Sequence, residues 1–489
     1  MNKELIIYWV RRDFRLEDNE ALSRAVKDAR NNKALFIPIF ILEDYMCIGD
    51  PKFQFGLPSR YFLSKAIPLY SSKFKKFALL KGKPTKIFSK LSKKYDISIY
   101  VNEDVHEDFY KQVKKIKDSN INIEVFADAL TISRETKTGN DKYYSVFTPF
   151  KKAVWNEFVS KSPIKKPSLD DLIYESGEMD DSLEISEKNI FKNFSDNRLL
   201  KVKNIIYDLS KLVADKTSYE NWYFDEDEAS KRYKKFIEHD LISYKNRRDS
   251  LELDATSRMS LALTWGLMSP RSLVHLIEKK YGETLRWDDI SKSREGAIHY
   301  ISELIWREFY KYLYFHHPNI MNEEFQERFR GKIDWVSDKI SQERFELWIR
   351  GETGYPIVDA AMHEIAQTGY MHNRARMIVA SILTKNLGVD WRYGQEYFRA
   401  MLIDLDDASN NGGWQWGASV GADPKPIRIF NPYLQSENYD SGGIYQKKYL
   451  PAHYFSNPPK PIVEHKDARV QAIKRYGLNE KKDGYARDY

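Results

Sequence analysis

Residues 404–416 (DLDDASNNGGWQW) bring together acids, amides, paired glycines and two tryptophans. Carboxylates and amides beside glycines can offer several hydrogen-bond partners to a flat heteroaromatic ligand. The competing interpretation is a capped loop whose tryptophans belong to the core. Taken alone, this segment favours the competing interpretation.

Two further segments combine groups that suit a nucleotide. Thr256, Ser257 and Arg258 precede a helical stretch, where hydroxyls and free backbone N–H groups can hold a phosphate or simply cap the helix. Glu303 and Trp306 are three residues apart and therefore share one helix face, where an acid and an indole can hold a base by hydrogen bonding and stacking. Helix capping and an exposed charged face are the simpler alternatives when each segment is considered alone.

A third group of residues suits a cofactor that contacts nucleic acid. Asn373, Arg376 and Met377 fall within one helical turn, and residues 244–249 (YKNRRD) carry basic groups suited to phosphates, although basic runs are also common on solvated surfaces. The chain has 10 His and 1 Cys, with no spacing typical of metal ligands, so we expect no metal site. No G-x-S-x-G nucleophile motif is present. The chemistry is therefore expected to come from a bound cofactor.

The elements that must position these residues differ between the two halves of the chain. In the first part, strands are predicted at 5–10, 34–42, 97–101 and 123–126, alternating with helices at 20–29, 59–77, 84–95 and 107–117. This alternation indicates a parallel, helix-covered sheet of the Rossmann-like kind. Neither G-x-G-x-x-G nor G-x-x-x-x-G-K-[ST] occurs, so the usual dinucleotide and triphosphate sites are not expected.

The rest of the chain is predicted to be helical after a long connection. Residues 131–219 are polar and weakly periodic, which indicates a surface connector or a partly disordered loop. Apolar residues then recur at helical spacing in seven stretches, namely 233–247, 258–265, 270–281, 295–315, 341–350, 355–368 and 371–387. We therefore predict an α/β domain at 1–130, a connector at 131–219 and an all-α domain at 220–489.

Composition excludes several classes of protein. No apolar run approaches the roughly 18 residues of a membrane span, and the N-terminus does not look like a signal peptide. A single cysteine excludes an intramolecular disulfide, so a cytoplasmic location is expected. A monomer without membrane contact is also expected. Lys and Arg number 78 against 71 Asp and Glu, and this net charge of +7 permits a nucleic-acid partner without requiring one.

The order of the segments resembles the photolyase/cryptochrome family. The similar motifs are residues 8–16 (YWVRRDFRL), 256–260 (TSRMS), 306–310 (WREFY), 353–362 (TGYPIVDAAM) and 410–416 (NNGGWQW), and the similarity runs from about residue 3 to 455. Five motifs in the family's order are far more specific than any one alone. The resemblance implies an N-terminal α/β domain and a C-terminal helical domain that holds a U-shaped FAD.

Within that family, the chain looks most like a class I cyclobutane pyrimidine dimer photolyase. Residues 371–377 (MHNRARM) lack the histidine pair expected of enzymes that repair the (6-4) lesion, and Asn410 stands where photolyases place an asparagine facing flavin N5. The implied activity is light-driven electron transfer from FAD to a flipped-out dimer in UV-damaged DNA. A cryptochrome-type blue-light photoreceptor and a (6-4) photolyase remain the alternatives.

Site roles follow from the resemblance, position by position. The implied flavin contacts are Tyr244, Thr256, Ser257, Arg258, Met259, Ser260, Glu303, Arg307, Asn373, Arg376, Asp404, Asp406 and Asn410. The implied lesion pocket comprises Glu303, Trp306, Asn373 and Met377, and the implied DNA contacts also include Arg248, Arg374 and Trp416. A tryptophan chain for photoreducing oxidised flavin is implied at Trp414, Trp391 and Trp335, although core packing explains tryptophans equally well.

Two positions depart from the family's pattern. Tyr300 stands where a tryptophan is common, which alters one edge of the pocket, and Asp254-Ala255 replaces a usual glycine before Thr256. A second, antenna chromophore is plausible in the N-terminal domain. Because residues 102–107 match the folate-antenna site poorly, a folate, a deazaflavin and a flavin all remain open.

Overall fold

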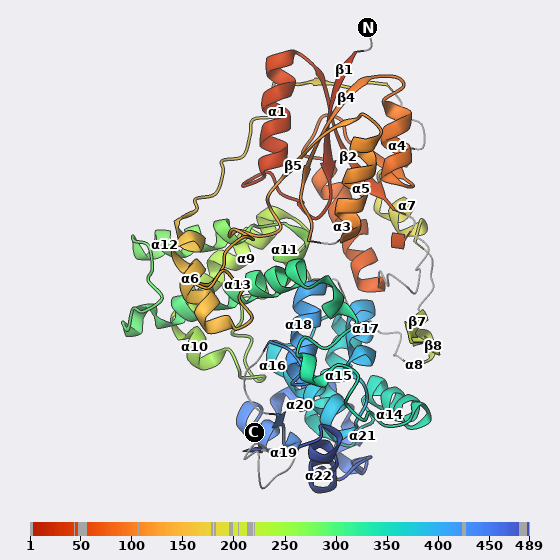
Figure 1. The fold of residues 1–489 in the computed structure, drawn as a ribbon, viewed down its shortest axis with the longest axis vertical. Coiled ribbons are helices and arrows are strands. Elements are labelled where there is room, and N and C mark those ends of the chain that lie inside the picture. The colour runs from red at the N-terminus through yellow and green to blue at the C-terminus, as the bar shows by residue number, and fades with distance from the viewer. Residues whose placement is uncertain are drawn as a thin grey trace.

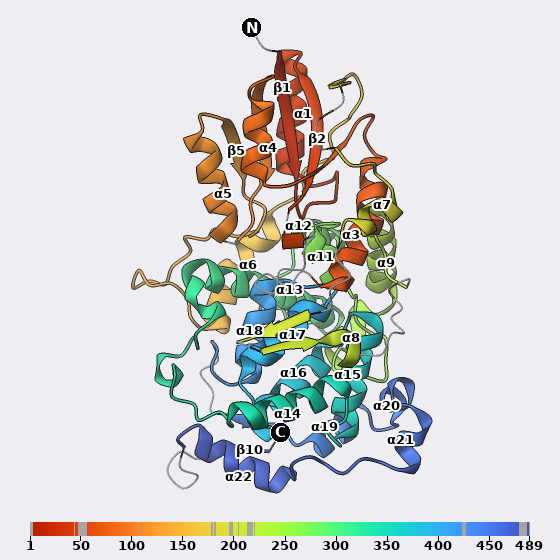
Figure 2. The same cartoon turned by 90° about the vertical axis from the view of Figure 1, so that its right-hand side faces the viewer.

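The computed structural model describes residues 3–43, 45–46, 56–105, 107–177, 179, 182–194, 199–203, 205–212, 219, 221–422, 427–478 and 487–488. The α/β domain forms one end of the molecule, and the helical domain extends from the carboxyl ends of its strands to the other end (Figures 1 and 2).

Five parallel strands make the core of the first domain. They are β1 (Glu4–Val10), β2 (Leu35–Leu42), β3 (Ala78–Lys81), β4 (Asp96–Asn102) and β5 (Asn122–Phe126), in the order β3-β2-β1-β4-β5. A short sixth strand, β6 (Ile173–Tyr174), pairs with the start of β2. The sequence prediction of a parallel, helix-covered sheet is confirmed. The helix predicted at 59–77 ends earlier, at residue 71. The sequence does not predict β3, because a four-residue strand gives little periodic signal.

Helices cover both faces of this sheet. α1 (Glu20–Asn32) and α3 (Leu57–Ser71) pack on one face, where Tyr8 of β1 joins the larger core cluster. α4 (Pro84–Leu91) and α5 (Glu107–Asp118) pack on the other, where Trp9 of β1 meets Phe88 and Phe109. Burial of both faces explains why β1 and β2 read as continuous apolar runs.

Segment 131–219, expected to be a surface connector, also contributes to both domains. Helix α6 (Phe147–Ser160) buries Phe150 and Trp155 against the helical domain, and the indole Nε1 of Trp155 donates to the Leu285 carbonyl at 2.8 Å. α7 (Glu187–Lys192) packs on α3. The hairpin β7 (Leu199–Val202) and β8 (Ile205–Asp208) is followed by the short α8 (Leu209–Leu212) and packs on a helix of the second domain.

The second domain is helical, as predicted. Its helices are α9 (Glu226–His239), α10 (Tyr244–Arg247), α11 (Ser260–Trp265), α12 (Pro270–Tyr281), α13 (Lys292–His316), α14 (Asp338–Arg350), α15 (Pro356–Thr368), α16 (Asn373–Ser381), α17 (Trp391–Met401), α18 (Asp407–Gly417), α19 (Pro432–Tyr439), α20 (Ile444–Tyr449), α21 (Ala452–Ser456) and α22 (His465–Arg475). Ser269 caps α12 by accepting from Ser272 N–H, with Pro270 in the first turn. Among the described residues, no helix combines the length and the apolarity that crossing a membrane requires.

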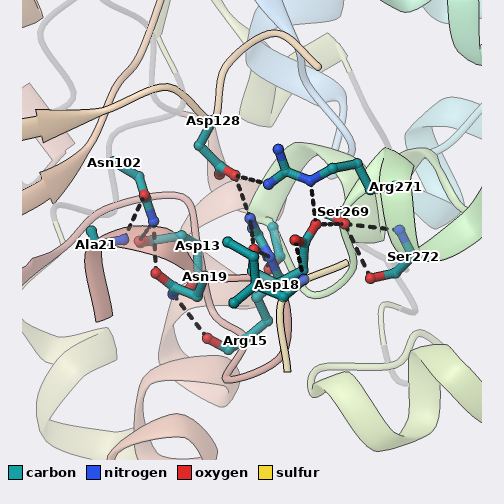
Figure 3. Close-up of polar contacts among 12 residues, drawn as sticks. Asp13, Arg15, Asp18, Asn19, Ala21, Asn102, Asp128, Ser269, Arg271 and Ser272 are labelled. Atoms are coloured by element: carbon teal, nitrogen blue, oxygen red, sulfur yellow. Dashed lines mark hydrogen bonds and ion pairs between the residues drawn. The ribbon is translucent and has the colours of Figure 1, made fainter. Parts of the chain in front are cut away.

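The motif at residues 8–16 and its continuation hold the two domains together (Figure 3). Asp18, which is fully buried, accepts from Arg271 Nε at 2.7 Å and from Ser269 at the start of α12. Arg15 donates to Asp128 at 2.5 Å, and Arg271 also lies 3.6 Å from Asp128. This buried network fixes the carboxyl end of the sheet against the helical domain, so these residues are structural.

Candidate functional site

A cavity of about 470 Å³ lies among α10, α11, α13, α16 and α18. Most of the predicted site residues line it, namely Tyr244, Arg248, Thr256, Ser257, Arg258, Met259, Ser260, Glu303, Trp306, Arg307, Asn373, Arg376, Met377, Asp404, Asp406, Asn410, Trp414 and Trp416. Arg374, Trp391 and Trp335 are not among the lining residues. Residues that are up to 172 positions apart in the sequence (244 to 416) thus meet in one cavity.

Hydroxyl groups cluster where the chain enters α11. The Ser257 hydroxyl lies 2.9 Å from the Tyr300 hydroxyl and accepts from Met259 N–H at 3.2 Å. Arg258 adopts a positive φ of 53° and its guanidinium lies 5.3 Å from the Tyr370 ring centroid. The departure at Tyr300 therefore adds a hydroxyl to this end of the cavity. Hydroxyls and a guanidinium together suit a phosphate-bearing ligand.

Arg376 and Asp404 form an ion pair on the cavity wall. Arg376 Nη2 donates to both carboxylate oxygens of Asp404, at 3.0 and 2.8 Å, and Arg376 Nε donates to the Met371 carbonyl at 2.7 Å. The Asp404 side chain is fully buried, whereas Arg376 is partly exposed. The pair presents a fixed, polar edge to the cavity.

Asp406 caps the N-terminus of α18 and places a carboxylate in the cavity wall. Its carboxylate accepts from Ser409 N–H at 2.8 Å and lies 3.4 Å from Lys311 Nζ. Burial by itself raises the pKa of Asp406, but the charges of Lys311 and Arg307 outweigh that effect and the net pKa lies below the usual value. Asp406 therefore stays ionised at neutral pH and can accept hydrogen bonds from a ligand.

Residues 407–417 form helix α18, so the simpler interpretation of this segment as a capped loop is wrong. Its two glycines serve different purposes. A Cβ on Gly412 would lie 2.1 Å from the Tyr310 ring, whereas a Cβ on Gly413 would meet no atom within 4 Å and Gly413 lines the cavity. Gly412 thus permits close packing, and Gly413 leaves room for a ligand against the helix.

Two buried polar atoms on α18 have no hydrogen-bond partner among the described residues. The side-chain amide nitrogen of Asn410 donates to the Gln395 carbonyl at 3.1 Å, but its side-chain oxygen accepts nothing. The indole Nε1 of Trp414 likewise has no acceptor. Buried polar atoms are normally paired, so these two indicate a ligand that would satisfy them.

Aromatic and charged side chains form the other end of the cavity. Trp306 stacks on Phe147 of α6, with ring centroids 3.6 Å apart and planes 9° from parallel. Glu303, one helical turn earlier, is paired with Arg248. Asn373 Nδ2 lies 3.8 Å from the Met377 sulfur. This end combines an acid, an indole and a thioether, which is the set predicted for the lesion pocket.

The other two predicted tryptophans are not among the residues that line the cavity. Trp391 is fully buried at the start of α17, where its Nε1 donates to Glu324 at 3.3 Å. Trp335 is partly buried and lies edge-on to Tyr476 at 6.0 Å. A further tryptophan that the sequence did not single out, Trp348, lies against Trp414.

Several lining residues were missed in the sequence. They are Leu263, Thr264, Leu304, Tyr310, Tyr370, Met371, Ala380, Phe398, Leu402, Ser409 and Gly413. Most are apolar or aromatic residues at ordinary helical spacing, so core packing explained them. Tyr310 was within the 306–310 motif, and its four-residue spacing from Trp306 was a usable signal that both share a face.

Comparison with known proteins decides the family. A family model described as DNA photolyase matches residues 6–168, and one described as the FAD binding domain of DNA photolyase matches residues 300–455. A deoxyribodipyrimidine photo-lyase of Alkalihalophilus pseudofirmus is 32% identical, over 95% of this chain and 96% of the relative. The chain belongs to the DNA photolyase family. Another family member, the deoxyribodipyrimidine photo-lyase of Escherichia coli, is 30% identical over 96% of this chain and 98% of its own length.

Solved structures agree with this placement. A class III photolyase from Agrobacterium tumefaciens superposes with a TM-score of 0.80 at 28% identity and covers 98% of both chains. A cryptochrome from Synechocystis superposes with a TM-score of 0.75 at 25% identity, over 100% of this chain and 96% of its own. The fold is therefore common to a photolyase and a cryptochrome, and the distinction between them depends on the site.

Proposed function

We propose that this protein is a deoxyribodipyrimidine photolyase, which uses light and FAD to repair cyclobutane pyrimidine dimers in DNA. One observation carries the proposal: a single cavity contains both Asp404 and Asn410 of the implied flavin set and Glu303 and Trp306 of the implied lesion set. Cofactor and lesion would therefore be adjacent. The full-length similarity to two deoxyribodipyrimidine photo-lyases supports the same activity.

The residues of the cavity fit FAD. The unpaired oxygen of Asn410 suits a ring N–H, and the open space at Gly413 suits a flat ring against α18. The hydroxyls near Ser257 and the guanidinium of Arg258 suit the pyrophosphate. When bound and reduced, FAD supplies the light-excited electron that splits the dimer.

The chain's own residues bind and orient the lesion. Glu303 is placed to hydrogen-bond the flipped dimer, and Trp306, held by Phe147, gives it an apolar wall. Arg248 and Arg374 are proposed to contact the phosphates of the bent backbone. Flipping costs a few kcal/mol and costs less for a damaged base, so the cavity favours the lesion over intact bases.

Four further points are part of the proposal. Trp414, Trp391 and Trp335 would relay an electron to oxidised flavin, a second chromophore would bind near the N-terminal domain, and the protein would act as a cytoplasmic monomer. Between the domains, the described residues enclose a cavity of about 50 Å³, lined in part by Arg11, Asn102 and Glu103, and another of about 240 Å³, lined in part by Arg15 and Met268. Both are smaller than the roughly 300–1,000 Å³ of typical ligand pockets, so an antenna chromophore at either place requires side chains to move.

Substitution of Glu303 tests the proposal. Glu303→Gln retains the shape of the pocket but weakens the carboxylate's hydrogen bond to the dimer, so repair per absorbed photon falls while the flavin content stays at the wild-type level. Glu295→Gln is the matched control, because Glu295 is a half-exposed acid on the same helix, paired with Lys245. An unchanged repair yield for Glu303→Gln contradicts the role proposed for that residue.

Lesion choice separates the alternatives. A cyclobutane dimer photolyase repairs cyclobutane dimers and leaves (6-4) products, whereas a (6-4) enzyme does the opposite. A photoreceptor binds FAD and changes conformation in light without repairing either lesion. The assay therefore offers both lesions to the same FAD-loaded protein.

A further inference from the structure

Four charged residues, two of which line the cavity, form a row of alternating sign. Glu303 pairs with Arg248, Arg248 Nε lies 3.8 Å from Asp249 Oδ1, and Arg374 Nη2 lies 2.9 Å from the same oxygen of Asp249. Both arginines are the residues proposed above to bind DNA phosphates. In the protein without DNA, each is therefore already neutralised by an acid of this chain.

The two arginines are held in place by more than their acids. The guanidinium carbon of Arg374 lies 4.3 Å from the centroid of the Tyr439 ring, and that of Arg248 lies 5.7 Å from the centroid of the Tyr244 ring. Their side chains are 13% and 20% exposed, whereas the Asp249 side chain is 36% exposed. The Tyr439 and Tyr244 rings can thus keep the two guanidinium groups in place when their acids exchange partners.

We propose that Asp249 is a specificity-determining residue, an internal counter-charge that opposes binding to the DNA backbone when no lesion enters the cavity. This inference rests on the proposed function. When an intact duplex offers a phosphate to Arg374, Arg248 remains on Glu303 and Asp249 loses its 2.9 Å ion pair, keeping only the longer 3.8 Å contact with Arg248 Nε. A carboxylate paired this weakly beside a bound phosphate is unfavourable, because the two anions repel each other.

A lesion in the cavity changes this balance. The imide N–H of a flipped thymine donates to the Glu303 carboxylate, which frees Arg248 from that acid. The guanidinium of Arg248 has five N–H donors, so it can take Asp249 as a partner and still reach a phosphate. Arg374 then binds a phosphate while Asp249 stays paired. Backbone binding is thereby coupled to the presence of a dimer through Glu303, Arg248 and Asp249.

Asp249→Asn tests the coupling by removing the counter-charge. We expect this variant to bind an undamaged duplex about threefold to tenfold more tightly, with a salt dependence steeper by up to about one phosphate contact. Its affinity for a duplex with a cyclobutane dimer rises by a smaller factor, so the preference for the lesion falls. Both affinities are measured in the dark by fluorescence anisotropy with labelled oligonucleotides, on FAD-loaded protein, over a series of salt concentrations.

Two further variants make the result specific. Asp288→Asn removes the same charge from an exposed ion pair with Arg286, whose residues do not line the cavity, and it should shift both affinities by less than about twofold. Asp249→Glu keeps the charge and should retain most of the wild-type preference, which shows that any change in Asp249→Asn is not a folding defect.

Two outcomes overturn the inference, and a third contradicts the proposed function on which it rests. Weaker binding of both duplexes by Asp249→Asn means that Asp249 only positions the arginines. Equal tightening on both duplexes, or the same tightening in Asp288→Asn, means that only net charge matters. A wild-type protein without any preference for the dimer contradicts instead the proposed function on which this inference rests, so the two failures are distinguishable.

Discussion

Trp414 lies edge-on to Trp348, with ring centroids 6.0 Å apart and planes inclined by 70°. Trp414 lines the cavity, whereas Trp348 is fully buried behind it and contacts Tyr397 at 5.4 Å. The cavity wall at Trp414 is therefore backed by an oxidisable ring other than Trp391, the partner implied by family resemblance.

This arrangement allows a direct test of the proposed tryptophan chain. Trp414→Phe should abolish light-driven reduction of oxidised flavin and leave repair by chemically reduced enzyme intact, because only the relay is removed. Trp391→Phe should behave in the same way, and Trp348→Phe should retain most of the photoreduction. Flavin absorbance under blue light with an external reductant is the measurement. If Trp348→Phe loses photoreduction and Trp391→Phe keeps it, the electron reaches Trp414 through Trp348.

The ion pair of Arg376 with buried Asp404 predicts a loss of both stability and flavin. Arg376→Ala leaves a buried carboxylate without its partner, so the free energy of unfolding should fall by about 3 kcal/mol. Arg376→Lys keeps a charge but not the paired contacts and should give an intermediate loss. Urea unfolding and flavin content report the two effects separately. Wild-type flavin content in Arg376→Ala would exclude a role for this pair in holding the cofactor.

His372 predicts a pH dependence of stability. It precedes α16, its Nδ1 accepts from Arg374 N–H at 3.2 Å, and burial lowers its pKa from 6.5 to about 4. Because the unfolded chain takes up this proton more readily than the folded protein, the contribution is complete above pH 6.5 and is lost as the pH falls toward 4. The loss between pH 7 and pH 5 amounts to about 2 kcal/mol.

The variant His372→Gln isolates this contribution. A glutamine oxygen can still accept from Arg374 N–H but does not titrate, so the difference in unfolding free energy between wild type and variant should shrink by that amount from pH 7 to pH 5. Carboxylates titrate in the same interval in both proteins and cancel in the difference. A difference that does not change with pH contradicts a buried, neutral His372.

The sequence was sufficient for elements with strong periodicity. β1 and β2 read as continuous apolar runs because helices cover both faces of the sheet, and the helix predicted at 270–281 matches α12 (Pro270–Tyr281). Two kinds of element were not foreseen. β3 is only four residues long, and α6 buries Phe150 and Trp155 within a segment whose polar composition indicated a surface connector.

Site residues were foreseen by motif, but their partners were not. Glu303 and Arg248 are 55 residues apart, and Asp249 and Arg374 are 125 apart, so no local pattern predicts that they form a row of charges. The same holds for the stacking of Phe147 on Trp306, since these residues come from α6 and α13. Such contacts depend on how distant helices pack, which periodicity does not specify.

The most direct test of the central claim is light-dependent repair by the purified, FAD-loaded and reduced protein. An oligonucleotide with one cyclobutane thymine dimer is incubated under blue light or in darkness, and the loss of the dimer is followed by chromatography. We predict complete repair in the light and none in the dark. Retention of the dimer under light, by protein that holds reduced FAD and binds the oligonucleotide, would contradict the assignment as a photolyase.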